Sequence, residues 1–572
     1  MSLSGISLYA LKNEMKEQLI GARVDKIYQE NKDLIFYLRN NRQNFVLYFC
    51  FSADNPAFYV TDKKFDNPKE PPMFTMLLRK YLLNSKIVDF RQIGLDRVVS
   101  IDFETSSDVF ELDTVSLNFE MMGKYSNLIL YNPEYNTIID ALIRVYPDMS
   151  SIRLVTPKEN YTLPISEKEN ILKLDKSEIY AIFDKNNIEP LSKAIYKYLE
   201  GFSPDDAMDI MYRLQIDDKV NFSSCNDHEK HAIVDEILKI KEKIENNDFT
   251  PTVIFNGDKP SKILAFNTLR PVKQKSFETM NEAVRFFYEK KAFIKLQSSR
   301  IHELEKSLKK KIESLNKALE NNEKDLIRAQ DRDNIKLTAD LLAANIYKIK
   351  KGDNKIVVNN FYSVNNEQIE IKLANELSPK QNVERLYKKY TKLKHAEEFL
   401  KNRIPKLQNE IYYLESVIVN LHQSETLLEL NAIRDELIKG GYIKTNTKKK
   451  IKSPKVSFRE FVSPNGFKIL AGRNNIQNDE LTNKLAHKSD LWFHLRNEPG
   501  THVILKSANK KYTDDDIMYA ASIAAALSGK TTKSDVDYAE VKYVKKIPGA
   551  KPGLVTYKNF KTVTVEPLNF KK

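Results

Sequence analysis

Cysteine, tryptophan and long apolar runs are scarce in this sequence, and each scarcity excludes a class of protein. The 572 residues include 2 Cys, 1 Trp and 15 Gly. Because Cys50 and Cys225 lie far apart and form no CxxC pair, we expect neither a disulfide framework nor a zinc site, and a reducing compartment such as the cytosol. No apolar run of about 18 residues or more appears, so we expect no membrane-spanning helix. The first residues also show no export signal.

Sequence motifs for the common catalytic chemistries are missing as well. GxxxxGK[ST], GxGxxG, HExxH and GxSxG do not occur. The sequence therefore contains no motif for nucleotide hydrolysis, dinucleotide redox chemistry, zinc proteolysis or serine hydrolysis. We expect a binding protein and not an enzyme, with no catalytic residue, metal or cofactor of its own.

The length predicts about three to five domains, because single hydrophobic cores seldom grow beyond roughly 300 residues. We predict an α+β multidomain chain. A helix–hairpin–helix element is indicated by two helical stretches, 191–200 and 204–214, on either side of Gly201-Phe202-Ser203. The predicted parts are a mixed α/β N-terminal domain (1–172), a helix–hairpin–helix domain (173–275), a coiled-coil middle domain (276–435), a basic linker (436–455) and a basic α+β C-terminal domain (456–572).

The middle domain shows the clearest periodicity in the chain. Leucines recur at intervals of seven from Leu386 to Leu421, which is a coiled-coil heptad. Apolar residues in the preceding segment, 276–345, provide the matching helix, and the short segment 346–378 between the two helices is strand-like. We expect the helices to fold back on each other, antiparallel, around a small tip at 346–378. The alternative is a coiled coil between two chains.

Positive charge is concentrated near the C-terminus. Residues 440–572 contain 25 Lys and Arg against 12 Asp and Glu, and residues 1–439 contain 66 of each kind. A surplus of 13 positive charges on a segment that resembles a folded domain predicts binding to nucleic acid through its phosphates. An anionic membrane surface is the weaker alternative.

Two strands around Glu498-Pro-Gly are predicted in the C-terminal domain. Strand alternation places Trp492, His494 and Arg496 on one face, with His502 on the second strand, and such a face can stack on bases and bind phosphate. In the alternative interpretation Trp492 belongs to the core and His494 is half-buried. Further along the chain, lysines beside Tyr543 predict a second phosphate-binding face: Lys542, Lys545, Lys546 and Lys551.

Two short segments of the N-terminal domain are candidate contacts. Asp96 and Arg97 follow Gly94 at a turn into a strand, where they can contact a base edge and a phosphate or close a local salt bridge. In the second segment a glycine, Gly123, stands where a strand must turn, and Lys124 follows it, which is compatible with the approach of a phosphate. This second segment consists of Glu120, Met121, Met122, Gly123 and Lys124.

Five segments together resemble the NFACT family, also known from its animal members as the NEMF family. They appear in family order over nearly the full length: Pro71-Pro-Met-Phe-Thr-Met-Leu-Leu-Arg-Lys-Tyr-Leu82, Gly94-Leu-Asp-Arg97, Glu120-Met-Met-Gly-Lys124, 377–394 with Leu377-Ser-Pro-Lys-Gln-Asn382, and Asp490-Leu-Trp-Phe-His494 through Pro499-Gly-Thr-His502. The predicted order of domains is similar to the layout of that family, in which the N-terminal domain resembles formamidopyrimidine-DNA glycosylase.

The resemblance implies a ribosome-associated quality-control factor of the cytoplasm. Such a factor binds stalled large (50S) ribosomal subunits that hold peptidyl-tRNA, through rRNA and a stalk-base protein. It recruits alanyl-tRNA and directs template-free alanine tailing of the nascent chain for degradation, while the ribosome forms the peptide bonds. The resemblance implies tRNA contacts at Asp96, Arg97 and 120–124, RNA contacts by the basic C-terminal domain, a monomer on the ribosome, and no membrane partner. It leaves open a small RNA-binding partner protein.

One residue departs from the family pattern, and two other functions were weighed. Ser4 stands where the family has an aspartate, which puts a tRNA contact from the first helix in doubt. A fibronectin-binding surface adhesin, as the older family name has it, should carry an export signal or a wall anchor, and we see neither. A nucleic-acid-processing enzyme of glycosylase-like fold needs an N-terminal proline nucleophile, whereas this chain begins Met1-Ser2-Leu3.

Overall fold

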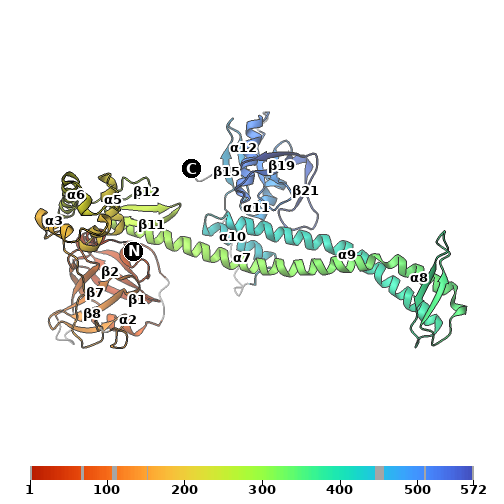
Figure 1. Ribbon diagram of the computed structural model, residues 1–572, viewed down its shortest axis with the longest axis horizontal. Helices are drawn as coiled ribbons and strands as arrows, with labels where there is room; N and C mark the ends of the chain where they lie inside the picture. The colour runs from red at the N-terminus through yellow and green to blue at the C-terminus, as the bar shows by residue number, and fades with distance from the viewer. Residues whose placement is uncertain are drawn as a thin grey trace. The chain divides into compact units, whose positions relative to one another are not determined.

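The computed structural model describes residues 3–65, 70–105, 113–150, 152–444, 456–507 and 511–569. Its contacts divide the chain into two compact units, Met1–Ile294 and Lys295–Lys572. Figure 1 shows the course of the chain from red at the N-terminus to blue at the C-terminus.

Unit 1 begins with helix α1 (Gly5–Leu19) and a large antiparallel sheet that contains nine strands of the described residues. Helix α2 (Met73–Leu82) begins directly after Pro71-Pro72. The order of the strands is β4-β3-β2-β1-β5-β6-β7-β8-β9. Their bounds are β1 (Arg23–Glu30), β2 (Asp33–Asn40), β3 (Gln43–Cys50), β4 (Ala57–Thr61), β5 (Lys86–Gln92), β6 (Val98–Glu104), β7 (Thr114–Glu120), β8 (Asn127–Asn132) and β9 (Thr137–Ala141).

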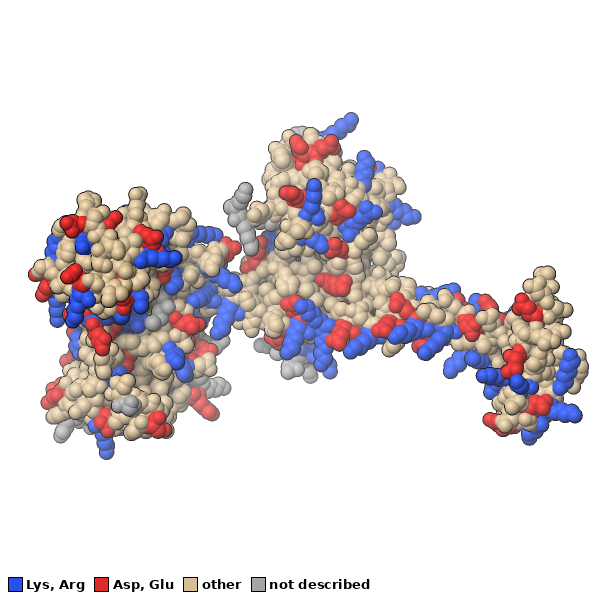
Figure 2. All heavy atoms as spheres, viewed as in Figure 1, with Lys and Arg blue, Asp and Glu red and all other residues tan. Residues whose placement is uncertain are grey.

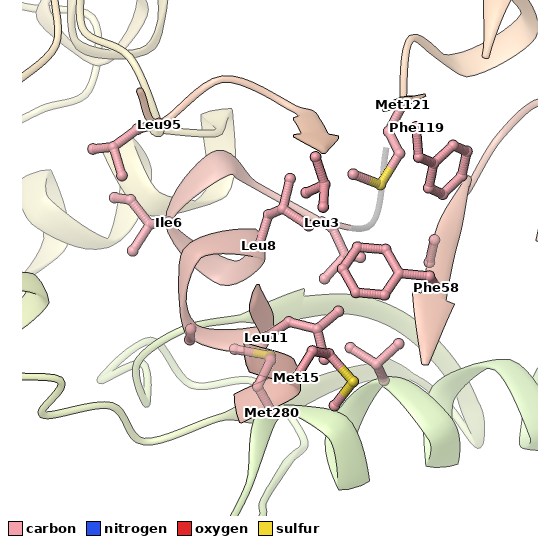
Figure 3. Close-up of a cluster of buried hydrophobic side chains, with 14 of the residues drawn as sticks. Leu3, Ile6, Leu8, Leu11, Met15, Phe58, Leu95, Phe119, Met121 and Met280 are labelled. Carbon is pink, nitrogen blue, oxygen red and sulfur yellow. The ribbon is translucent and has the colours of Figure 1, made fainter. Parts of the chain in front are cut away.

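Helix α1 is part of the hydrophobic core that packs on this sheet. Leu8, Leu11 and Met15 of the helix are fully buried, and Figure 3 shows them in one cluster with Phe58 of β4 and Phe119 of β7. The rings of Phe58 and Phe119 lie 6.3 Å apart, edge to face, although their strands are far apart in the sheet order. The apolar face of α1, which also includes Leu19, is thus part of the core of unit 1.

Residues 173–275 contain helices and also a small sheet. The helices are α3 (Lys176–Lys185), α4 (Leu191–Tyr198), α5 (Pro204–Arg213) and α6 (Asp227–Glu245). The predicted hairpin is confirmed, because the side chain of Ser203 caps α5 in a capping box with Asp206. Sequence analysis missed the three-stranded sheet formed by β10 (Thr252–Asn256), β11 (Lys259–Leu264) and β12 (Gln274–Ser276).

The long helices form the antiparallel pair that the heptads predict. They are α7 (Met280–Gln330), which continues from unit 1 into unit 2, α8 (Arg332–Ala344) and α9 (Pro379–His422). Partners run in opposite directions along the two segments: Gln297 with Ser424, Glu305 with His422, Arg332 with Glu397, and Asp340 with Tyr387. The pairing lies within one chain, so the described structure needs no second chain to form the coiled coil.

The tip between the two helices is a two-stranded hairpin. It consists of β13 (Lys355–Asn359) and β14 (Gln368–Lys372), paired antiparallel. Val358 and Ile371 are buried against α8, and Leu386 of α9 joins the same cluster. The prediction of a short strand-like tip is confirmed.

The C-terminal part of unit 2 begins with a helix that sequence analysis did not identify, α10 (Leu427–Lys439). Residues 427–435 of this helix fall in the predicted coiled-coil domain and 436–439 in the predicted linker, of which 445–455 lie outside the described residues. Six described strands then form an antiparallel sheet in the order β15-β16-β18-β17-β19-β22. The bounds are β15 (Arg459–Val462), β16 (Lys468–Ala471), β17 (Leu491–Leu495), β18 (Val503–Leu505), β19 (Ser534–Glu540) and β22 (Lys561–Val565).

This sheet is covered on both faces. Helix α12 (Asp514–Leu527) packs its alanines against Phe493 and Leu495 on one face. The other face, with Trp492 and Ile504, packs against Leu481 and against a small hairpin. The covering elements are α11 (Asn475–Glu480), the π-helical turn η4 (Leu481–Leu485), β20 (Val544–Lys546) and β21 (Val555–Tyr557).

No helix in the described ranges is long and apolar enough to cross a membrane. Within the same ranges, no group of three or more His, Cys, Asp or Glu side chains could hold a metal ion.

Candidate nucleic-acid interface

The predicted turn that carries Asp96 and Arg97 is held from two sides. Gly94 has φ +57°, and a Cβ there would lie 2.5 Å from the Glu200 carboxylate. That carboxylate accepts a hydrogen bond from Leu95 N at 3.1 Å. The Gln92 side-chain amide donates to the Asp96 carbonyl oxygen at 2.7 Å. Glycine is therefore required at the turn both for its backbone conformation and for the close approach of the helical hairpin.

Asp96 and Arg97 are both half-buried. The backbone N–H of Arg97 donates to Asp96 Oδ1 at 2.7 Å, so the acid caps its own turn. Burial lowers the pKa of the Arg97 guanidinium, although the charge of Asp96 acts in the opposite direction. Lys168 is a neighbour that sequence analysis missed: burial, and then the charge of Arg97, lower the pKa of its amine. No local motif marks Lys168.

The second predicted segment lies beside the first, because Met121 N donates to the Arg97 carbonyl oxygen at 2.9 Å. The carboxylate of Glu120 is buried and accepts two hydrogen bonds from Arg153, at 2.6 and 2.8 Å, and one from Tyr161 at 2.9 Å. Met121 points into the core (Figure 3) and is 2% exposed. The structure thus contradicts a direct RNA contact by the side chains of Glu120 and Met121, because β7 ends inside the domain and its last carboxylate serves as an anchor.

Gly123 and Lys124 lie where a ligand can reach them. Gly123 has φ +64° and begins a short 3-10 turn, η1 (Gly123–Tyr125). Lys124 is exposed, and its amine lies 4.8 Å from the centre of the Tyr125 ring. Tyr125 is 72% exposed, so an aromatic face and a cation stand together at this edge. Tyr125 was not among the predicted RNA contacts, although an aromatic residue directly after Lys124 is a pattern that can indicate nucleic-acid binding.

Trp492 and His494 share one face of the sheet, as predicted, but other residues cover that face. Their rings are nearly parallel, with centres 5.5 Å apart, as strand alternation predicts. Trp492 is fully buried and His494 is 7% exposed, because Tyr557 of β21 packs on the indole at 4.8 Å. The expectation that these two side chains form an RNA-binding surface is contradicted, and the core interpretation of Trp492 is confirmed.

His502 is buried in the same cluster. Its Nδ1 lies 2.8 Å from Thr482 Oγ1, and its ring meets Trp492 edge-on at 5.3 Å. Burial lowers the pKa of His494, and burial together with the neighbouring His494 lowers the pKa of His502 well below its usual value. Both histidines are therefore neutral near pH 7 and do not supply positive charge to a phosphate.

The predicted basic residues of the C-terminal domain are exposed or partly exposed. Lys542 pairs with Glu540 at 2.7 Å and Lys546 with Asp479 at 2.9 Å. The amine of Lys551 lies 4.9 Å from the centre of the Tyr442 ring. Arg496 and Lys545 are exposed, and within the described residues no carboxylate within 4 Å is recorded for either. Figure 2 shows Lys and Arg side chains on this domain with acidic side chains among them.

Comparison with protein families matches almost the whole chain. Residues 4–456 match the model of the NFACT N-terminal and middle domains. Residues 457–559 match the NFACT protein RNA binding domain.

Similar proteins were found in bacteria and animals. The Rqc2 homolog RqcH of Bacillus subtilis is 31% identical over 579 residues, which cover 99% of this chain and 98% of that protein. The human ribosome quality control complex subunit NEMF is 25% identical over 368 residues, which cover 60% of this chain and 32% of that protein. A solved structure, the C-terminal part of the fibronectin/fibrinogen-binding protein from Streptococcus suis, is 32% identical and covers 48% of this chain and 97% of its own, with a TM-score of 0.38.

Proposed function

The chain belongs to the NFACT family, and from that premise we propose that it is a ribosome quality-control factor of the RqcH type. It binds the large (50S) ribosomal subunit that still carries a peptidyl-tRNA, and it works in the cytoplasm in association with ribosomes. The main support for the proposal is that residues 4–456 and 457–559 match the two NFACT family models, the second of which is an RNA-binding domain.

In this proposal the chain recruits alanyl-tRNA and directs template-free addition of alanine to the stalled nascent chain, which marks it for degradation. The ribosome forms the peptide bonds, so the chain itself is not an enzyme. Its partners are rRNA, a stalk-base protein reached by the coiled coil, the tRNA, the peptidyl-tRNA nascent chain and a small RNA-binding partner protein. We propose that it acts as a monomer and without a membrane.

The arrangement of charges supports separate contacts for tRNA and for ribosomal RNA. Asp96, Arg97 and Lys124 belong to unit 1, where two strands and a backbone hydrogen bond bring their segments together. The lysines around Tyr543 belong to unit 2. Phosphate contacts set affinity and position, whereas contacts to base edges set selectivity. We assign selection of the tRNA to unit 1 and most of the general RNA affinity to unit 2.

Capture of the tagged chain from cells, followed by sequencing of the bound RNA, tests this function. Large-subunit rRNA without small-subunit rRNA, together with one enriched tRNA species, is the expected result. Enrichment of tRNA for alanine supports alanine tailing, and another enriched tRNA would replace alanine as the added residue. Absence of any enriched RNA would refute the proposal. Binding of the same preparation to immobilised fibronectin tests the adhesin alternative.

A double variant tests the division between the units. Asp96→Ala with Arg97→Ala should abolish tRNA enrichment and leave recovery of large-subunit rRNA nearly unchanged. The matched control is Asp25→Ala with Lys26→Ala, because these two residues are an adjacent acid and base that are exposed on β1. Equal loss of tRNA and rRNA in the first variant, or loss of tRNA in the control, would contradict the assignment of the tRNA contact to the turn at Gly94.

A further inference from the structure

A cleft on the C-terminal domain lies at the end of β17, away from the lysines around Tyr543. Its volume is about 510 Å³, and its walls come from the residues after β17 and from the connection between α12 and β19. The lining is almost entirely polar or charged, and includes Arg496, Asn497, Glu498, Lys530, Lys533 and Asp535.

The two walls of the cleft are fixed to each other by the sheet. Leu495 pairs with Val536 in the ladder between β17 and β19, and Arg496 N donates to the Asp535 carbonyl oxygen at 3.0 Å. The loop after β17 is also tied to the coiled coil, because Tyr412 Oη donates to the Glu498 carbonyl oxygen at 2.8 Å. Side chains that line this cleft therefore stand on a rigid frame, which lowers the entropic cost of binding.

The charges in the cleft are unevenly paired. Glu498 binds Lys530 at 2.5 Å, and Asp535 accepts a hydrogen bond from Thr564 at 2.7 Å. Glu498 is thus in an ion pair, whereas Asp535 is hydrogen-bonded but keeps its negative charge. Arg496 and Lys533 are exposed, and no acidic partner within 4 Å is recorded for either in the part of the chain that the structure describes. An arginine and a lysine on one cleft, neither of them in a recorded ion pair with the two carboxylates of its lining, suit a phosphate oxygen.

We propose that this cleft is a binding site for the phosphodiester backbone of RNA, with Arg496 and Lys533 as the phosphate contacts. The inference rests on the proposed RNA-binding function and adds a second contact region to the lysines around Tyr543. Glu498 lowers the affinity of the site for phosphate, because it holds Lys530 in an ion pair and places a negative charge at the cleft. Replacement of Glu498 by an uncharged residue should therefore strengthen RNA binding.

The cleft can be tested with the full-length chain and a 20-nucleotide single-stranded RNA of one sequence. The dissociation constant is measured over a range of salt concentrations. Arg496→Ala with Lys533→Ala removes two phosphate contacts, so the slope of log affinity against log salt should fall by about 1.4. Glu498→Gln should change affinity in the opposite direction, with a steeper slope as Lys530 becomes available.

A matched control removes the same charge from the far end of the same sheet. Lys468 and Lys511 are exposed, and the bonds from Lys506 N to the Lys468 carbonyl oxygen and from Tyr512 Oη to the Leu505 carbonyl oxygen place both at that end. Lys468→Ala with Lys511→Ala should leave the slope unchanged. Thermal unfolding of each variant shows whether the domain is intact.

Chemical protection gives a second measurement that needs no variant. Acetylation of the Lys533 amine should slow when RNA is bound, while acetylation of Lys511 should not. A normal slope in the cleft variant, equal losses in the cleft and control variants, or unprotected Lys533 would each overturn the cleft while the wild-type chain still binds RNA. Failure of the wild-type chain itself to bind the RNA would instead overturn the proposed function, and the cleft with it.

Discussion

Replacement of Glu436 by glutamine should remove a pH dependence from the joint between the coiled coil and the C-terminal domain. Glu436 lies in α10 and is 3% exposed. The hydroxyl of Tyr413 on α9 donates to its Oε1 at 2.7 Å. Burial raises the pKa of Glu436 to about 7, in spite of this hydrogen bond, which acts in the opposite direction. The neighbouring α11 is joined to α9 by hydrogen bonds, since Asn475 Nδ2 donates to Ser416 Oγ at 2.8 Å.

The sign and size of the effect follow from the two pKa values. The carboxyl has an ordinary pKa of 4.5 when exposed and a pKa of about 7 in the folded joint, so the folded state binds the proton more tightly. Stability from this group is therefore present at low pH and is lost as the pH rises from 4.5 through 7. Each pKa unit corresponds to about 1.4 kcal/mol, so the local free energy of unfolding should be about 2 kcal/mol higher at pH 5.5 than at pH 8.

Amide hydrogen exchange of the full-length chain measures this local free energy, because it reports the opening of α10 and α11 separately from the rest of the molecule. The quantity to compare is the difference between wild type and Glu436→Gln at each pH, since subtraction removes the contributions of other groups such as His494 and His502. That difference should change by about 2 kcal/mol between the two pH values. Glu398→Gln, at an exposed position of α9, serves as the control. A difference that is the same at pH 5.5 and pH 8 would refute the reasoning.

Three further predictions concern single side chains. In Gly5→Ala the new Cβ would lie 1.8 Å from the Leu95 carbonyl oxygen, so unit 1 should lose about 1–3 kcal/mol of stability, which is measured as a lower melting temperature. Gly257→Ala is the control, because its added carbon meets nothing within 4 Å. The loss of stability in the control should be limited to the cost of a left-handed φ at alanine. Glu120→Ala leaves the Arg153 guanidinium without its buried partner and should cost about 3 kcal/mol in denaturant unfolding; a cost below about 1 kcal/mol would contradict the anchor. Burial would raise the pKa of Asp516, but hydrogen bonds from Ser463, Thr513 and Asn465 outweigh it and lower the pKa well below 3.8, so Asp516→Asn should destabilise the C-terminal domain at neutral pH, and the difference from wild type should shrink as the pH falls below 3.8.

Local patterns predicted the elements whose signals lie within the element itself. The heptad leucines predicted α9, and the helical stretches on either side of Gly201-Phe202-Ser203 predicted α4 and α5. Leu430, Ile433 and Leu437 have helical spacing and are all buried, so the sequence does contain a local signal for α10. The sheet β10–β12 was harder to predict, because its third strand is only three residues long and wholly exposed, so it has no alternation of its own.

The candidate site was predicted in part, and the error has a physical cause. Alternation along β17 shows correctly that Trp492 and His494 share a face, but it carries no information on what covers that face. The cover includes Val544 and Tyr557, which lie 52 and 65 residues beyond Trp492 in the chain. Exposure of a strand face is thus decided by packing at long range, whereas the order of side chains along the strand is decided locally.

The sequence gives the number of charged residues, but only the structure shows which of them already form ion pairs. Lys546 binds Asp479 at 2.9 Å, and the lysine side chain is 44% exposed. Ion pairs at such positions contribute little, about 0–1 kcal/mol. RNA phosphate can therefore displace the carboxylate, but it must compete with it, and the released acid is then left close to the phosphate.

Asp479→Asn tests this competition, because it removes the competing carboxylate and keeps the lysine. If the lysines around Tyr543 bind RNA, the variant should bind single-stranded RNA more tightly, and the slope of log affinity against log salt should rise by about 0.7 as Lys546 gains one phosphate contact. Glu460→Gln is the matched control, since Glu460 pairs with Lys468 at the same distance of 2.9 Å on β15 and β16. Equal effects of the two variants would mean that only net charge matters and that the lysines around Tyr543 make no specific contact with RNA.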